Sequence, residues 1–211
     1  MTSPDLTPDH SSQEPQKPKF RIPIPPALAP LVAHFTQIYE ICIWERGPRS
    51  LPSSLPMTLI YLVAYIGAKT VQYGLEKVWG GDKAWETAVY IALGDTLALL
   101  LLTFLLLFIT LKLPRLPQAL LALLATGTAV ALLRTLTAGS LDLLSPVSLK
   151  TIGLYGTLLF PLLVWNVTIQ ASILRSTTEF HYIAALIVAC LHAAACYMVL
   201  NGLAPPPLPM R

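Results

Sequence analysis

Apolar positions gather in five long blocks of the 211-residue chain, with few polar residues inside each block. The blocks cover about residues 56–79, 85–113, 118–138, 149–174 and 180–203. A run of roughly 18 or more apolar residues is typical of a transmembrane helix. The pattern predicts an all-α fold, a polytopic membrane helix bundle with five transmembrane helices. The third block contains Arg134, so four spans are the alternative.

Residues 31–47 show a shorter pattern. Four apolar residues recur there at helical spacing: Leu31, Phe35, Ile38 and Cys42. His34, Gln37 and Glu40 occupy another sector of the same helix. A segment of this length is too short to span a bilayer, so the pattern predicts an amphipathic helix in the membrane interface. A helix docked on a partner protein is the alternative, and Gly47 is expected to end the helix.

The composition supports a membrane protein. Hydrophobic residues make up 55% of the chain and charged residues only 12%, whereas a soluble domain carries about 25% charged residues. An ordinary water-soluble globule is therefore excluded at this stage. Residues 1–30 contain eight of the 19 prolines, which predicts a disordered, Pro-rich cytoplasmic tail. Residues 204–211 form a second Pro-rich tail.

The loops sort the basic residues between the two sides of the predicted bundle. With the N-terminus inside, the cytoplasmic loops carry Arg46, Arg49, Lys112, Arg115 and Arg175. The opposite side carries Lys77, Lys83, Lys150 and Arg211. The positive-inside rule favours this orientation. Short loops and the lack of a signal peptide predict a bacterial inner membrane. The net charge of +3 is too small to indicate nucleic acid as a partner.

Three charged residues fall inside the predicted spans: Lys69, Asp95 and Arg134. Each costs about 2.5–3.5 kcal/mol on insertion scales unless it finds a partner. Counted from the ends of neighbouring helices, Lys69 and Asp95 lie at matching depths, and Arg134 approaches from the third span. The cluster is either a proton or ion site or an interhelical clamp that neutralises itself.

A second polar group is predicted on the last two spans. Asn166 and Gln170 are four residues apart and therefore share a helix face, with Pro161 one turn earlier. His192 on the next span is expected near Asn166. These side chains form either the polar lining of a solute path or ordinary interhelical hydrogen bonds.

Other features indicate packing rather than chemistry. Ala185, Ala189 and Ala193 form a small-residue strip, which suits close helix packing within the protein or against a partner subunit or second copy. Cys190 and Cys196 are too far apart along one helix for a disulfide and are expected to be small buried residues. No zinc-protease, Cys-x-x-Cys, phosphate-loop or nucleophile-elbow motif is present. The sequence therefore predicts no catalytic, cofactor or metal-binding residues.

The layout resembles the Yip-type membrane family: a Pro-rich N-terminus, five spans, short loops and a minimal C-terminal tail. The segment Glu45-Arg46-Gly47-Pro48-Arg49-Ser50-Leu51-Pro52 also resembles one in small uncharacterised bacterial inner-membrane proteins. The resemblance covers about residues 30–203 and concerns layout alone. It implies a scaffold or trafficking role rather than an enzyme, and it transfers no site residues.

Three functions follow as hypotheses. The first is an integral membrane accessory or structural subunit that docks in a larger membrane assembly. The second is a small proton- or ion-coupled permease that uses Asp95, Lys69 and Arg134. The third, a membrane enzyme acting on lipid, lacks a paired acid and base.

Overall fold

The computed structural model describes residues 29–45, 47–48, 51, 54–75, 84–144 and 152–203. These residues form six α-helices and a short 3-10 helix, which confirms the prediction of an all-α fold. The helices are α1 (Ala29–Cys42), α2 (Leu55–Leu75), α3 (Ala84–Ile109), η2 (Leu113–Arg115), α4 (Leu116–Leu144), α5 (Ile152–Thr178) and α6 (Tyr182–Leu203). The predicted tails lie outside the described residues, except for the start of α1.

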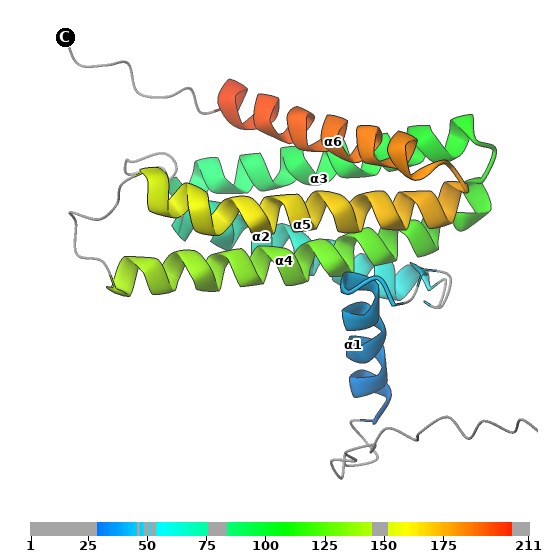
Figure 1. Cartoon of the computed structure of the whole chain (residues 1–211), viewed down its shortest axis with the longest axis horizontal. Helices are drawn as coiled ribbons and strands as arrows, with labels where there is room; N and C mark the ends of the chain where they lie inside the picture. The colour runs from blue at the N-terminus through cyan, green and yellow to red at the C-terminus, as the bar shows by residue number, and fades with distance from the viewer. Residues whose placement is uncertain are drawn as a thin grey trace, which may run out of the picture.

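Helices α2 to α6 run side by side along the long axis of the molecule, and α1 extends away from the side of the bundle, near α4 (Figure 1). Each of the five predicted spans falls on one of these helices. Their contacts close a ring, because α2 packs against α3 and α4, α3 against α6, and α5 against both α4 and α6. Helix α6 therefore lies between α3 and α5. This ring surrounds the site described below.

Three helices end on a residue with left-handed backbone geometry. Trp44, Leu111 and Glu179 have φ angles of 62°, 56° and 63° and follow α1, α3 and α5. After α3, the Lys112 N–H donates to the Leu107 carbonyl at 2.8 Å and the Leu111 N–H to the Phe108 carbonyl at 3.0 Å, a Schellman arrangement. The same geometry at Trp44 ends α1 at Cys42. Gly47, the expected helix stop, lies beyond this cap.

Helix α4 is longer than the apolar block that predicts it. It continues through Arg134 to Leu144, six residues past the predicted boundary at 138. Arginine is a good helix former, so a charged residue interrupts the apolar pattern without interrupting the helix. Arg134 consequently lies well inside α4 and not close to its end.

The half of the bundle next to α1 contains a packed apolar core. Residues 121–125 of α4 are almost completely buried, with Leu121, Ala122 and Leu124 at 0% exposure. Ile38 and Ile41 of α1 are buried in the same cluster. The Trp165 indole N–H of α5 donates to the Cys42 carbonyl at 3.2 Å, which fixes the end of α1 against the bundle.

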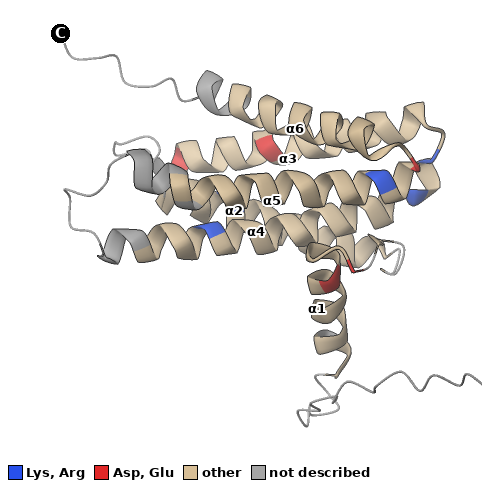
Figure 2. Cartoon of the chain, in the orientation of Figure 1, with Lys and Arg blue, Asp and Glu red and all other residues tan. Residues whose placement is uncertain are grey.

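An ion-paired cluster closes the bundle where α3 leads into α4 and α5 into α6. Glu179 pairs with Lys112 and with Arg115, the latter at 2.8 Å. Arg115 also donates to the Thr177 carbonyl at 3.0 Å. Figure 2 shows that charged residues are otherwise sparse along the helices. The two helix turns at this end are thereby tied together.

Within the described residues, two helical segments are long and apolar enough to cross a membrane, Trp85–Ile109 and Leu113–Ser140. Tyr182–Met198 is a shorter apolar helix. Judged by length and composition alone, two such helices are weak support for a membrane protein, because a core helix of a soluble protein passes the same test.

Candidate functional site

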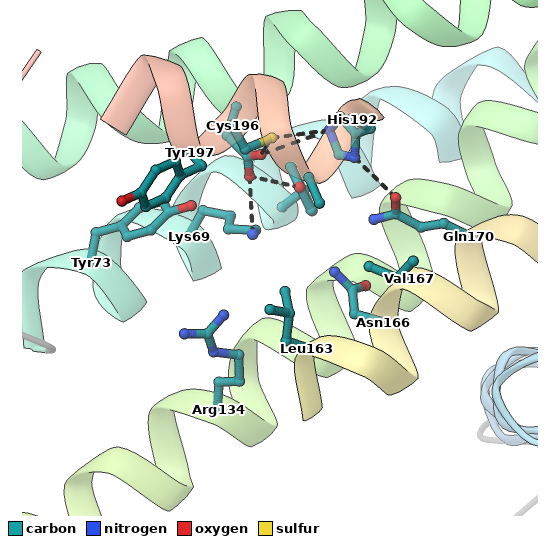
Figure 3. A pocket seen from close by; sticks show the side chains of 13 residues that line it. Lys69, Tyr73, Arg134, Leu163, Asn166, Val167, Gln170, His192, Cys196 and Tyr197 are labelled. Carbon is teal, nitrogen blue, oxygen red and sulfur yellow. Dashed lines mark hydrogen bonds and ion pairs between the residues drawn. The ribbon is translucent and has the colours of Figure 1, made fainter. Parts of the chain in front are cut away.

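A polar cavity of about 260 Å³ lies inside the ring of helices, in the half of the bundle away from the Glu179 cluster. Its lining includes all six residues of the two predicted polar groups: Lys69, Asp95, Arg134, Asn166, Gln170 and His192. Figure 3 labels Lys69, Arg134, Asn166, Gln170 and His192, which reach the cavity from different helices. The two groups, which the sequence places in separate constellations, form one site because α6 packs against both α3 and α5.

Asp95 is the centre of the hydrogen-bond network. It is 2% exposed, and its Oδ2 atom accepts a hydrogen bond from the Tyr65 hydroxyl at 2.8 Å. The Lys69 Nζ atom lies 3.0 Å from the same oxygen. This ammonium group also lies 5.5 Å from the ring centroids of Tyr65 and Tyr73. The Lys69 side chain, which is 12% exposed, thus has one carboxylate and two aromatic faces as partners.

The other carboxylate oxygen faces α6. The Cys196 thiol donates to Asp95 Oδ1 at 2.5 Å, and His192 Nε2 lies 3.8 Å from that oxygen. Cys196 Sγ and His192 Nε2 are 3.3 Å apart. On the far side of the imidazole, Nδ1 lies 2.9 Å from Gln170 Oε1 of α5. One connected network therefore joins α2, α3, α5 and α6.

Local helix geometry explains how the side chains reach one face. Tyr65, Lys69 and Tyr73 are spaced four residues apart on α2, and His192 and Cys196 are spaced four apart on α6. The Tyr65 ring can lie against α4 only because residue 127 is glycine. A Cβ atom there would lie 2.6 Å from Tyr65 Cε2. Gly127 thereby positions the hydroxyl that binds Asp95.

The structure brings the predicted pair of Lys69 and Asp95 into direct contact. Arg134 lines the same cavity from α4 and stands apart from the contacts of Asp95 in Figure 3. His192 contacts Gln170, whereas Asn166, its expected neighbour, lines the cavity one turn away.

The small-residue strip is used inside the chain. Ala185 and Ala189 are 0% exposed, and Ala193 lines the cavity. The strip was expected to pack either within the protein or against a partner subunit. Contacts within one chain are sufficient to bury Ala185 and Ala189.

Sequence reasoning missed Tyr65, Tyr73 and Cys196. Each lies one helical turn from a residue that was singled out, so the four-residue spacing was the available signal. The expectation that both cysteines of α6 are buried is wrong for Cys190, which is exposed, and Cys196 is only half-buried. Although no metal ligands were predicted, ligand atoms of Asp95, His192 and Cys196 lie within 4.8 Å of one another.

Comparison with known protein families gave no match, and searches among curated proteins and solved structures gave no significant match either. The resemblance in layout to the Yip-type family stays a prediction.

Proposed function

We propose that the protein is an integral membrane protein that binds a small anionic solute in its polar cavity and carries it across the membrane, coupled to protonation at Asp95. The single observation that carries the proposal is the distribution of polarity. Charged and hydrogen-bonding side chains converge inside the bundle, while large apolar side chains cover its outside. This is the arrangement expected when the surrounding solvent is lipid.

The outer face of α3 illustrates the apolar surface. Leu93, Leu97 and Leu101 follow one another at helical spacing and are 45%, 65% and 62% exposed. Ile183, Ile187 and Leu191 form a similar exposed row on α6. In water, contiguous apolar surface of this kind is rare on a monomer, because it favours association. Hydrocarbon covers it without cost.

The dimensions support five spans. Helix α3 has 26 residues, which is about 39 Å at ~1.5 Å per residue and exceeds the ~30 Å hydrocarbon core. Lys112, Arg115 and Arg175 lie near the same pair of helix turns, so the positive-inside rule favours that end, and the N-terminus, on the cytoplasmic side. A bacterial inner membrane is the proposed location.

The size and charge of the cavity define the solute. The cavity volume of about 260 Å³ suits a small solute. The charged residues of the lining are Lys69, Arg134 and Asp95, two cations and one anion. A small anion is the proposed solute, and Lys69 is its proposed cationic partner in the cavity. Asn166 supplies an amide for hydrogen bonding from α5.

Asp95 is the group that couples charge to movement. Among the residues that line the cavity, Asp95 is the one carboxylate, and it is paired with Lys69. Protonation of Asp95 therefore leaves Lys69 able to pair with the anionic solute. The carrier would then take up one proton with one anion. Lys69 would thus pair with Asp95 in one state and with the solute in the other, so the ion pair would take part in transport as well as in packing.

Flux into proteoliposomes tests the proposal. The purified chain is reconstituted with an entrapped pH-sensitive dye, and sodium methanesulfonate, a small permanently charged anion, is added outside. We expect the lumen to acidify with the wild-type chain and not with Asp95→Asn. Glu86→Gln is the matched control, because Glu86 is an exposed carboxylate on the same helix. Equal acidification with the wild type and Asp95→Asn contradicts the proposal.

The accessory-subunit hypothesis makes a different prediction. A docked subunit migrates on native gels in a large complex of defined composition after gentle solubilisation. A carrier of this design migrates alone or as a small homo-oligomer and retains flux after purification.

A further inference from the structure

We propose that Asp95, His192 and Cys196 form a binding site for a thiophilic divalent transition metal, with zinc as the representative ion. The proposal goes beyond solute transport and concerns a different state of the site, because a metal-bound Asp95 does not take up the proton that transport requires. It rests on the convergence of three different ligand types on one point of the cavity wall.

The distances fit a metal site with a small adjustment. Zinc binds thiolate, imidazole and carboxylate at ~2.0–2.3 Å, so ligand atoms of a tetrahedral site lie about 3.2–3.7 Å apart. Cys196 Sγ lies 3.3 Å from His192 Nε2, and His192 Nε2 lies 3.8 Å from Asp95 Oδ1. The contact of Cys196 with Asp95, at 2.5 Å, must open by about 1 Å to admit the ion.

Proton accounting favours a cation at this point. The carbonyl oxygen of Gln170 faces His192 Nδ1, so Nδ1 carries the hydrogen of a neutral imidazole and Nε2 presents a lone pair. Asp95 Oδ1 is an acceptor only. The thiol hydrogen of Cys196 is then the one hydrogen available between three electron-rich atoms. A metal ion that replaces it satisfies all three.

Each ligand is held by a further contact on its other side. Gln170 fixes the imidazole through Nδ1, and the Tyr65 hydroxyl and Lys69 fix Asp95 through Oδ2. Metal-binding histidines and carboxylates are usually oriented by such outer partners. The free atoms, Nε2 and Oδ1, are the ones that face Cys196.

The same geometry argues against a nucleophilic thiol. In a nucleophile–base–carboxylate relay, the carboxylate holds the imidazole nitrogen that points away from the nucleophile. Here Gln170 occupies that nitrogen, and Asp95 contacts the thiol directly. The three groups meet at one point instead of forming a chain.

The charges balance with one more ligand. Asp95 and a Cys196 thiolate contribute −2, Lys69 contributes +1 and the ion +2, which leaves +1. A zinc-bound water has a pKa of about 7, so a hydroxide in the fourth position cancels the remaining charge of this group of ligands, Lys69 and ion. All three ligands line the cavity, which gives that position room for a water or hydroxide.

Cobalt substitution tests the proposal. The full-length chain, purified in detergent and stripped with a chelator, is titrated with Co²⁺, whose thiolate complexes give a charge-transfer band in the near ultraviolet. We expect the band to saturate at one ion per chain, with release of the thiol proton and of one proton from the metal-bound water. Cys196→Ser should lose the band, and Cys190→Ser, the matched control on the exposed side of α6, should keep it.

Gln170→Ala provides a second variant that leaves all three ligands in place. Loss of an outer partner should lower the affinity for Co²⁺ about 10–100-fold while the band keeps its shape. The proposal is overturned if the folded wild-type chain gives no band at saturating Co²⁺, or if Cys196→Ser keeps it. A Co²⁺ band without methanesulfonate flux refutes the proposed transport alone, and flux without the band refutes the metal site alone.

Discussion

The two halves of the helix bundle are built on opposite principles. Next to α1, the interior is dry: Leu121 and Leu124 of α4 and Ile169 of α5 are 0% exposed and touch other apolar side chains. In the other half, the interior holds the cavity with Lys69 and Asp95, and the same helix α4 turns Leu132 and Leu136 outward, at 49% and 70% exposure. Apolar packing in the first half stabilises the fold, whereas the buried charges of the second half lower the stability.

The difference shows where to look for function. An apolar interior can be filled by many combinations of side chains, so its residues report mainly on packing. Buried ionised groups are costly unless they are paired, and they are retained where they serve chemistry or fix an arrangement. The cavity half concentrates such groups, which is why both proposals place their chemistry there.

The largest expected effect comes from breaking the ion pair. Asp95→Leu leaves the Lys69 ammonium buried without its carboxylate, and we expect a loss of about 3–5 kcal/mol in the free energy of unfolding. The double variant Lys69→Met/Asp95→Leu should recover most of this loss, because an apolar pair can replace a buried ion pair. Thermal unfolding of the chain in detergent measures both.

The double variant also separates clamp from carrier. If the pair is only an interhelical clamp, a folded double variant keeps methanesulfonate flux. We predict that it folds and has no flux. A double variant with wild-type flux would show that transport does not use this ion pair. The charged pair would then serve only to stabilise the fold, as the apolar core does.

A smaller effect is expected at Gly127, which lies at the boundary between the halves. The added methyl group of Gly127→Ala would lie 2.6 Å from Tyr65 Cε2, so the buried ring must move and its hydrogen bond to Asp95 must lengthen. We expect a loss of about 1–3 kcal/mol, measured by thermal unfolding. Gly139→Ala is the control on the same helix, because a Cβ there meets nothing within 4 Å. Equal destabilisation by both substitutions would contradict this account of Gly127.

The smallest effect concerns the exposed cluster at the end of the dry half. Hydrogen bonds from Lys112 and Arg115 lower the pKa of the Glu179 carboxyl from 4.5 to about 2. Because the pKa falls on folding, the stabilisation is fully present above about pH 4.5 and is lost as the pH falls through about 2. The difference in unfolding temperature between the wild type and Glu179→Gln should therefore shrink over this range. A difference that grows as the pH falls would have the wrong sign.

Much of the fold follows from the sequence, because long apolar blocks and turn residues are local signals. The five blocks each coincide with a helix, and the pairing of Lys69 with Asp95 follows from their matched depths in neighbouring helices. The ends of the helices were harder to predict from the sequence. Trp44 and Leu111 adopt left-handed geometry that usually requires glycine, so Gly47 was the more natural expectation.

The assembled site required information that no local pattern contains. Helix α6 packs against α3 as well as against its sequence neighbour α5, and this places Cys196 on Asp95 across a separation of 101 residues. The choice of Gln170 over Asn166 as the partner of His192 depends on the rotation of α5 about its axis. Such rotations are set by packing in the finished bundle.

We propose that the cavity of the bundle is wet and that the outer surface of the bundle faces lipid. Thiol labelling in intact membranes with a small charged methanethiosulfonate reagent tests it most directly. One chain retains only Cys190, on the exposed side of α6, and another carries only Ala193→Cys, in the cavity lining. We predict rapid labelling of Ala193→Cys and almost none of Cys190. Rapid labelling of Cys190 with protection of Ala193→Cys would show the polarity of a water-soluble protein and contradict the account.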